Sequence, residues 1–142
     1  MRALLDINVL IALHDRDHVH HSHATSWLAA NIKHGWASCP LTQNGCLRIM
    51  SQDGYSNPQP LSVLMPMLLH STSDAHHHFW SDDISLLDAA RFNHGFTHSP
   101  RQLTDLYLLG LAVKQGARLV TFDQRIPLSA VRGASPRHLV TL

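Results

Sequence analysis

The sequence predicts an α/β fold around a mostly parallel sheet, and three observations lead to this prediction. Short apolar segments alternate with helical ones along the chain, as they do in parallel-sheet domains. The chain has 142 residues, 44% of them hydrophobic and 15% charged, which is typical of a single globular domain spanning residues 1–142. Two apolar segments run directly into an aspartate, Asp6 and Asp123, and ligands of such sheets bind beyond the carboxyl ends of the strands.

Five short apolar segments are expected to form the strands. The first ends at Asp6, the second is stopped by Pro40, and the third is half-exposed because it contains three consecutive histidines. The five segments are residues 2–6, 36–40, 76–80, 117–123 and 138–142.

Helices are expected between these strands. Ser22 is a candidate cap of the second helix and Gly35 its end, Thr42 lies near the cap of the third, and Pro66 bends or restarts the fourth. The last helix is apolar around most of its circumference and should be buried. The expected helices are residues 7–14, 22–35, 41–51, 60–72, 85–92 and 99–116, with loops at 15–22 and 52–60.

Three aspartates form the candidate site. Asp6 ends the first strand, Asp123 ends the fourth, and Asp105 lies in the first turn of the last helix, where the helix dipole favours an anion. If the strands are parallel, the three carboxylates meet at one edge of the sheet, and such a cluster is tolerated mainly when a cation holds it together. Oxygen donors of this kind suit Mg²⁺ or Mn²⁺. Taken singly, each aspartate is as well explained as a loop opener or a helix cap.

Composition limits the other possibilities. The formal net charge of +1 neither indicates nor excludes a nucleic-acid partner. Cys39 and Cys46 lie within or beside apolar segments and are expected to be buried thiols in a reducing cytosol. No stretch approaches the roughly 20 apolar residues that span a bilayer, and Asp6 comes too early for a signal peptide, so we expect a cytoplasmic protein.

Histidine is unusually frequent, with thirteen copies and clusters at residues 18–23 and 76–78. A metal site is one interpretation of these clusters, because imidazole is a common ligand. The spacing matches no zinc pattern, however, and a polar loop and a half-exposed strand explain the clusters better.

Three segments, in their order along the chain, resemble the PIN-domain family and most of all its VapC-type toxins. They are LLDINVLIAL, PLTQNGCLRIMS and QLTDLYLLGLAVKQGARLVTFD. The resemblance covers nearly the whole chain, and its most specific part is LTDLYLLGLA followed by LVTFD. It implies a three-layer α/β/α sandwich, a Mg²⁺-dependent endoribonuclease, a homodimer and a small cognate antitoxin that silences the enzyme.

The resemblance also assigns roles to individual residues. Asp6, Asp105 and Asp123 match the acidic positions of the family, and Asn8 matches the small polar residue after the first of them. The second acidic position, usually a glutamate, falls at Gln43. Glutamine keeps a carbonyl oxygen that can orient a metal-bound water, but it lacks the charge. The resemblance therefore implies one tightly held ion on Asp6 and Asp105, with Asp123 closing the shell directly or through water.

The family chemistry is hydrolysis by a metal-activated water. Asp105 or Asp123 would orient that water for in-line attack on the phosphate, leaving a 5′-phosphate and a 3′-hydroxyl. Three arginines are candidates for contacts with the RNA backbone, namely Arg48, Arg101 and Arg125, although a surface or interface ion pair is the favoured alternative for Arg48. Trp27, Trp36 and Trp80 are expected in the core, and Asp82 and Asp83 at a turn or a helix start.

Two other functions fit parts of the pattern. A phosphatase with an aspartyl nucleophile needs a second aspartate two residues after the first, but Asn8 stands there and cannot donate a proton. A PIN-like domain that binds RNA or a partner protein without cleavage stays open, because Gln43 replaces an acid. The apolar segment 60–69 is either a dimer interface or part of the core.

Overall fold

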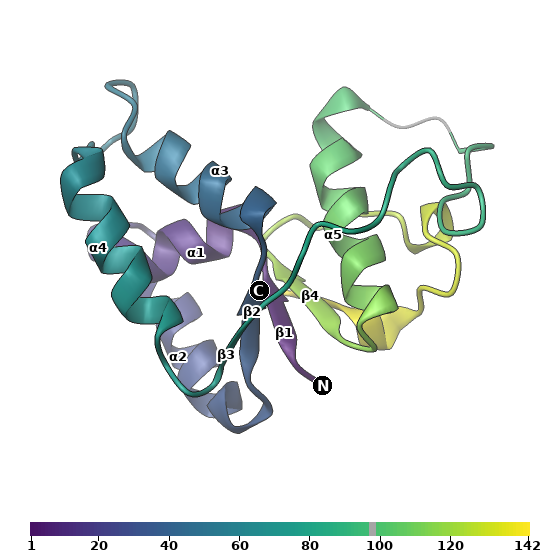
Figure 1. Ribbon diagram of the computed structural model, residues 1–142, viewed down its shortest axis with the longest axis horizontal. Coiled ribbons are helices and arrows are strands. Elements are labelled where there is room, and N and C mark those ends of the chain that lie inside the picture. The colour runs from purple at the N-terminus through teal and green to yellow at the C-terminus, as the bar shows by residue number, and fades with distance from the viewer. Residues whose placement is uncertain (97–98) are drawn as a thin grey trace.

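A five-stranded sheet forms the centre of the computed structural model, which describes residues 1–96 and 99–142. The strands lie in the order β3-β2-β1-β4-β5, and every pairing is parallel (Figure 1). All carboxyl ends of the strands therefore lie at one edge of the sheet. The five expected strands are confirmed, each shorter than expected: β1 Ala3–Leu5, β2 Trp36–Ser38, β3 His77–Phe79, β4 Arg118–Thr121 and β5 Leu139–Thr141.

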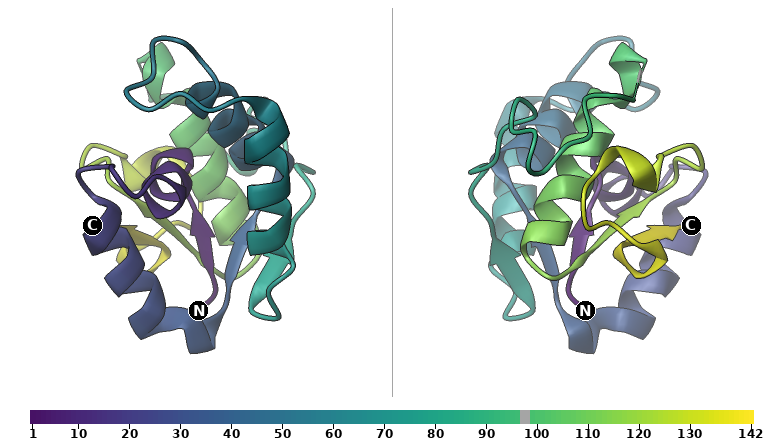
Figure 2. Two further views of the ribbon diagram at one scale, coloured as in Figure 1. Left: turned by 90° about the vertical axis from the view of Figure 1, so that its left-hand side faces the viewer. Right: turned by 90° about the vertical axis from the view of Figure 1, so that its right-hand side faces the viewer.

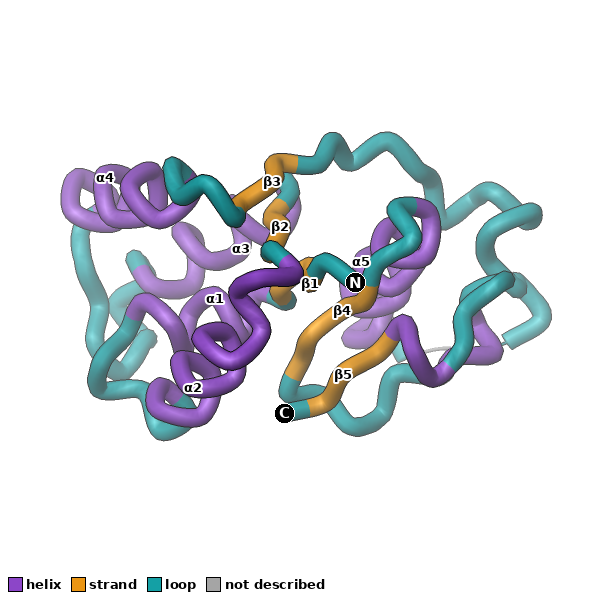
Figure 3. The backbone as a smooth tube through the Cα atoms, turned by 90° about the horizontal axis from the view of Figure 1, so that it is seen from below, coloured by secondary structure: helices purple, strands orange, loops and turns teal. Residues whose placement is uncertain are grey.

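Helices cover both faces of the sheet, which confirms the expected three-layer sandwich. Alternation along β1 explains the two layers, because Leu4 packs against α5 on one face while Leu5 packs against α1 and α3 on the other. The tube in Figure 3 shows α1 to α4 on one side of the strands and α5 on the other, and Figure 2 views these two sides in turn. The helices are α1 Ile7–His14, α2 His21–Asn31, α3 Pro40–Met50, α4 Leu61–Thr72 and α5 Leu103–Lys114.

Short 3₁₀ turns complete the described elements. η1 Ile32–His34 follows α2, η2 Pro100–Gln102 precedes α5, and η3 Leu128–Ala130 and η4 Pro136–His138 lie between β4 and β5. The buried face of α5 fits the expectation of a largely buried helix. Pro66 lies inside α4, which continues through it. No helix of the described residues is long and apolar enough to cross a membrane.

The prediction of a helix at residues 85–92 is wrong, because this segment forms successive turns. Ser85 and Asp88 turn their side chains back onto the chain, where Ser85 Oγ accepts from Leu87 N at 3.1 Å and Asp88 Oδ1 accepts from Ala90 N at 2.9 Å. Such local hydrogen bonds compete with helix formation. Phe92 then inserts into the core and bridges Val131.

The start of α2 differs from expectation, whereas Thr42 lies near the cap of α3 as expected. α2 begins at His21, so Ser22 is not its cap, and His20 at the cap position makes no side-chain capping bond. α3 begins at Pro40, and Thr42 binds back to Cys39, donating to its carbonyl at 3.1 Å and accepting from its N–H at 3.0 Å. Gly35 ends the α2–η1 segment with a φ of 75°, as expected.

The expected core residues are largely confirmed. Trp36 and Trp80 are buried, and the partly buried Trp27 has the Arg118 guanidinium 5.0 Å from its ring centroid. Cys39 and Cys46 are buried free thiols, and burial raises their pKa to about 11 and about 12.

Candidate active site

The topology brings the ends of distant segments to one edge of the sheet. β1, β2 and β4 all end there because they are parallel. α3 starts directly after β2, and α5 must start at the same edge because its other end leads back into the opposite end of β4. This edge therefore receives Asp6, Asp123, Gln43 and Asp105 from four elements, as the sequence predicts.

Asp6 is almost completely buried, with 3% of its surface exposed. It caps α1, where its Oδ1 accepts from Ile7 N at 2.7 Å, and its Oδ2 accepts from Thr121 Oγ1 at 2.6 Å. Burial raises the pKa of Asp6, the two hydrogen bonds oppose this rise, and the charge of Asp123 adds to it. The carboxylate is thus fixed in place and still sensitive to neighbouring charge.

Asp105 and Asp123 complete the acidic cluster. Burial, followed by the charges of Asp6 and Asp123 and a hydrogen bond with Asp123, raises the pKa of Asp105 to about 7. Asp123 is held from both sides, since its backbone N donates to Thr121 Oγ1 at 3.0 Å and its Oδ1 accepts from Arg125 N at 2.8 Å. The Thr121 hydroxyl therefore links Asp6 and Asp123, a contact that the sequence does not reveal.

This donor set fits a hard divalent cation. Within the part of the chain that the structure describes, no group of three or more His, Cys, Asp or Glu is already arranged around an ion position. Mg²⁺ binds through a few carboxylates and keeps several waters, so it does not need a closed protein shell. A cation would also relieve the repulsion that raises the pKa of Asp105.

Gln43 lies in the first turn of α3 and is held by a buried hydroxyl. Its Nε2 donates to Ser38 Oγ at 2.9 Å, and Ser38 Oγ bonds His77 Nε2 at 2.8 Å. Ser38 ends β2, the strand next to β1, so Gln43 stands one strand away from Asp6. Among the described residues, no hydrogen bond to Gln43 Oε1 occurs.

An open pocket of about 460 Å³ adjoins the carboxylates. Asn8, which is exposed, lines it together with Asp123, Arg125, Phe122 and Gln124. Arg125 is 87% exposed at its side chain, with its Nε 3.8 Å from Asp123 Oδ1. The pocket thus combines one carboxylate of the cluster with a cation and an aromatic ring.

The other two candidate arginines, Arg101 and Arg48, lie on other elements. Arg101 is exposed in η2, a turn tied to the pocket because Gln102 Nε2 donates to the Arg125 carbonyl at 3.1 Å. Arg48 is exposed further along α3, and the described residues include no ion pair for it. Asp82 and Asp83 stay outside the cluster, since Asp82 accepts from Leu41 N and Asp83 pairs with Lys114.

The histidine clusters serve separate local contacts. His77 binds Ser38, His76 binds Asp74, and His21 Nδ1 bonds the Ala12 carbonyl. The ring of His20 stacks on that of Phe122 at the rim of the pocket, a contact without any signal in the sequence.

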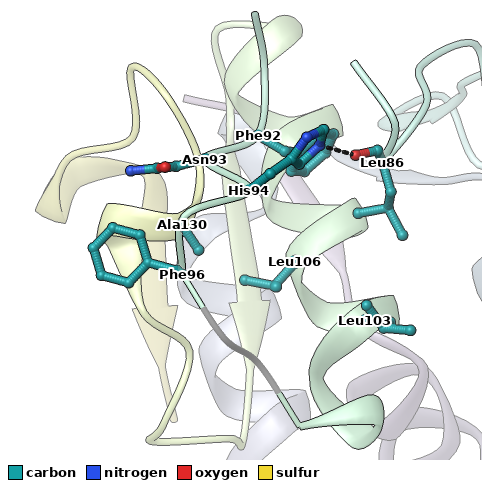
Figure 4. Close-up of a pocket in the computed structure, with 8 residues that line it drawn as sticks. All are labelled: Leu86, Phe92, Asn93, His94, Phe96, Leu103, Leu106 and Ala130. Carbon is teal, nitrogen blue, oxygen red and sulfur yellow. Dashed lines mark hydrogen bonds between the residues drawn. The ribbon is translucent and has the colours of Figure 1, made fainter. Parts of the chain in front are cut away.

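A second, apolar cavity of about 230 Å³ lies beside α5 (Figure 4). Leu86, Phe92, Leu103 and Leu106 contribute to its walls, and His94 Nε2 is fixed by the Leu86 carbonyl at 2.7 Å. It contains no carboxylate, so the chemistry belongs to the acidic edge.

Known proteins of one family match this chain. The family model described as PIN domain matches residues 3–132. Ribonuclease VapC44 of Mycobacterium tuberculosis is 50% identical over 142 residues, with both chains fully covered. Ribonuclease VapC39 of the same organism is 39% identical over 134 residues, covering 94% of this chain and 96% of that protein.

A solved structure shares the fold. VapBC2 from Rickettsia felis, bound to a DNA fragment from their promoter, contains a chain that matches with a TM-score of 0.59 and 14% identity. The match covers 89% of this chain and 94% of that chain.

Proposed function

Because this chain belongs to the PIN-domain family and, within it, to the VapC group, we propose that it is a divalent-metal-dependent endoribonuclease and the toxin of a toxin–antitoxin pair. The observation that carries this proposal is the meeting of Asp6, Asp105 and Asp123 at one edge of the sheet, with the pKa of Asp105 raised to about 7 by burial and by the other two charges. Such a cluster is favourable when a cation neutralises it.

Each residue of the site then has a defined task. Asp6, Asp105 and Asp123 would hold Mg²⁺, for which Mn²⁺ could substitute, and the bound ion would supply a more acidic water and neutralise charge on the scissile phosphate. Asp6 is a fixed ligand because Ile7 and Thr121 hold its carboxylate in place. Asp105 or Asp123 orients the attacking water, and Gln43 Oε1 accepts a hydrogen bond from it. No side-chain nucleophile is needed. Water, in place of the ribose 2′-hydroxyl, would attack the phosphorus and displace the 3′-oxygen, so the products would be a 5′-phosphate and a 3′-hydroxyl.

Substrate contacts would come from the cations around the pocket. Arg125 and Arg101 lie on two segments joined by the Gln102 hydrogen bond, which supports the proposal that both contact an RNA backbone beside the carboxylates. Asn8 offers an amide in the pocket wall, and Arg48 would contact more distant phosphates along α3.

The proposed protein partners are a cognate antitoxin and a second copy of the chain. α4 supports such contacts because it buries Leu64 and Leu68 while exposing Val63, Met65 and Leu69. An apolar helix face of this kind is typical of an interface.

We propose that the protein acts in the cytoplasm, where Cys39 and Cys46 stay reduced.

Cleavage of labelled total RNA tests the proposed function. The protein is incubated with Mg²⁺, Mn²⁺ or EDTA beside an Asp6→Asn variant, which removes one ligand charge and keeps the side-chain shape. We expect cleavage that needs the metal and falls at least about a hundredfold in the variant, the loss of a major electrostatic contribution. Protein free of antitoxin that binds RNA and cuts none with either metal would instead support the non-catalytic alternative, in which Gln43 has replaced a needed acid.

A further inference from the structure

We propose that the paired rings of Phe122 and His20 form a platform that stacks an unpaired nucleobase of the RNA beside the cleaved bond. We call these two residues the ring platform. This inference rests on the proposed ribonuclease function and adds a base-binding site to it. It concerns the aromatic wall of the pocket at Asp123, which the carboxylate chemistry leaves without a task.

The first observation is the position of Phe122. It follows the end of β4 and immediately precedes Asp123, and it lines the pocket with Asn8 and Asp123. Its ring is partly buried and packs against the core beneath α1 and α2. A base bound there would place its own phosphate close to the carboxylates, because base and phosphate belong to the same nucleotide.

The second observation is the contact between Phe122 and His20. Their ring centroids are 4.6 Å apart and their planes differ by 26°, which is a stacked arrangement. His18 lies beside His20 with its ring tilted by 45° and its centroid 5.7 Å away, and its Nδ1 accepts from the His20 backbone N–H at 3.0 Å. Flat side chains thus meet at the rim of the pocket although 102 residues separate His20 from Phe122.

The third observation is that His20 stabilises the helix it precedes through its backbone alone, with its carbonyl accepting from Ala24 N at 3.0 Å. It occupies the cap position of α2, where Ser, Thr, Asp or Asn would accept a hydrogen bond from the first turn, yet its side chain makes no such bond. His20 is exposed, so it adds little to the core. Among the described residues, its side chain contacts the rings of Phe122 and His18.

These features match the chemistry of single-stranded RNA. Proteins bind unpaired bases by stacking them on aromatic or imidazole rings beside a cation that holds the backbone. Arg125, with 87% of its side chain exposed, supplies that cation in the wall of the same pocket. A paired base keeps both faces covered by its neighbours, so the ring platform selects unpaired RNA.

The test measures binding of a short fluorescein-labelled single-stranded RNA by anisotropy, in EDTA to prevent cleavage. We expect His20→Leu, which keeps bulk without a flat ring, to weaken binding about tenfold, the size of one lost stacking contact. His20→Phe keeps the ring and should bind like the unaltered protein. His23→Leu, an exposed histidine on the next turn of α2, is the matched control and should change nothing.

Two further readouts separate stacking from a structural effect. With Mg²⁺ present, His20→Leu should raise KM and leave kcat unchanged, because binding is lost and the carboxylates are untouched. The fluorescence of 2-aminopurine in the RNA should be quenched on binding to the unaltered protein and to His20→Phe, and not on binding to His20→Leu.

Several outcomes would overturn the proposal. Equal affinity of His20→Leu and the unaltered protein would remove the ring platform while leaving the ribonuclease intact, provided RNA is still cut. Equal weakening in His20→Leu and His20→Phe would assign the contact to the imidazole nitrogens instead of stacking. Unaltered protein that neither binds nor cleaves RNA would overturn the proposed function itself, and the ring platform with it.

Discussion

The hydrogen bonds around Ser38 fix the direction in which the Gln43 amide faces. Gln43 Nε2 donates to Ser38 Oγ at 2.9 Å, and the same hydroxyl lies 2.8 Å from His77 Nε2. The amide nitrogen of Gln43 is therefore the side that faces Ser38. Gln43 Oε1 is left without a hydrogen bond among the described residues, and under the proposed function it faces the water that a metal would hold.

Replacing Gln43 with glutamate tests this arrangement. The added carboxylate should tighten Mg²⁺ binding about tenfold, because one more anionic donor meets the cation. It also takes away the proton donor to Ser38, which should lower the free energy of unfolding by about 1 kcal/mol. Mg²⁺ titrations of the RNA cleavage rate and of the melting temperature measure the two effects.

Gln43→Met is the matched control, since it keeps the length of the side chain and removes the amide without adding a charge. This variant should cleave RNA more slowly than the unaltered protein. If the unaltered protein, Gln43→Glu and Gln43→Met all reach half their cleavage rate at the same Mg²⁺ concentration, the side chain at this position does not face the metal. The contacts among Gln43, Ser38 and His77 would then be purely structural.

Close packing of α5 against the turn segment 85–92 shows how one small residue sets the distance between two elements. A Cβ atom at Gly110 would lie 2.5 Å from Phe92 Cζ and 2.8 Å from Phe92 Cε1. Phe92 is 3% exposed and belongs to the core cluster under α5. The ring also borders the apolar cavity of Figure 4, so an added Cβ at Gly110 would force it to shift from its packed position toward that cavity.

Gly110→Ala is expected to destabilise the fold although alanine favours helices. Helix propensity alone would add about 1 kcal/mol of stability, but overpacking of a core ring costs about 1–3 kcal/mol. We expect a net loss in the free energy of unfolding, measured by urea denaturation. Gly54→Ala is the control, because nothing lies within 4 Å of a Cβ there. Equal stability of the two variants would mean that Phe92 moves without cost.

The elements also show which parts of the structure the sequence determines locally. Strands β1 and β4 were predictable because an apolar run ends abruptly at Asp6 or at Asp123. The absence of a helix at 85–92 was not predictable, because composition does not show that the side chains of Ser85 and Asp88 bind the backbone two residues further on. The convergence of the three aspartates followed from parallel strands. By contrast, the Thr121–Asp6 bond joins residues 115 positions apart and needed the fold itself.

At the scale of the whole molecule, the fold assembles a repulsive site from three distant segments. Asp6, Asp105 and Asp123 are far apart in an unfolded chain, and folding brings their charges together. Repulsion between these charges therefore destabilises the folded state as the carboxylates ionise. A bound cation should remove this destabilisation. Stability, pH and metal binding are thus linked through one cluster.

The pH dependence of stability follows from the pKa of Asp105. Its value of about 7 in the folded protein lies above the ordinary value of 3.8. Between these values the folded state keeps a proton that the unfolded state has lost, so the free energy of unfolding falls as the pH rises from about 4 to about 7 and stays low above that. Because Asp105 is partly exposed, we expect a loss on the order of 1 kcal/mol, or about 4 °C in melting temperature.

Asp105→Asn should remove most of this loss. In EDTA at pH 8 the variant should melt about 4 °C higher than the unaltered protein, while at pH 4 the two should be alike. Mg²⁺ at a hundredfold its Kd would stabilise the unaltered protein by about 2.7 kcal/mol, and the variant should lose most of that gain. Asp53→Asn, an exposed aspartate in the loop after α3, is the control and should behave like the unaltered protein. If Asp105→Asn melts lower than the unaltered protein at pH 8 in EDTA, the carboxylate is stabilising as an anion, and the repulsion that argues for a cation is absent.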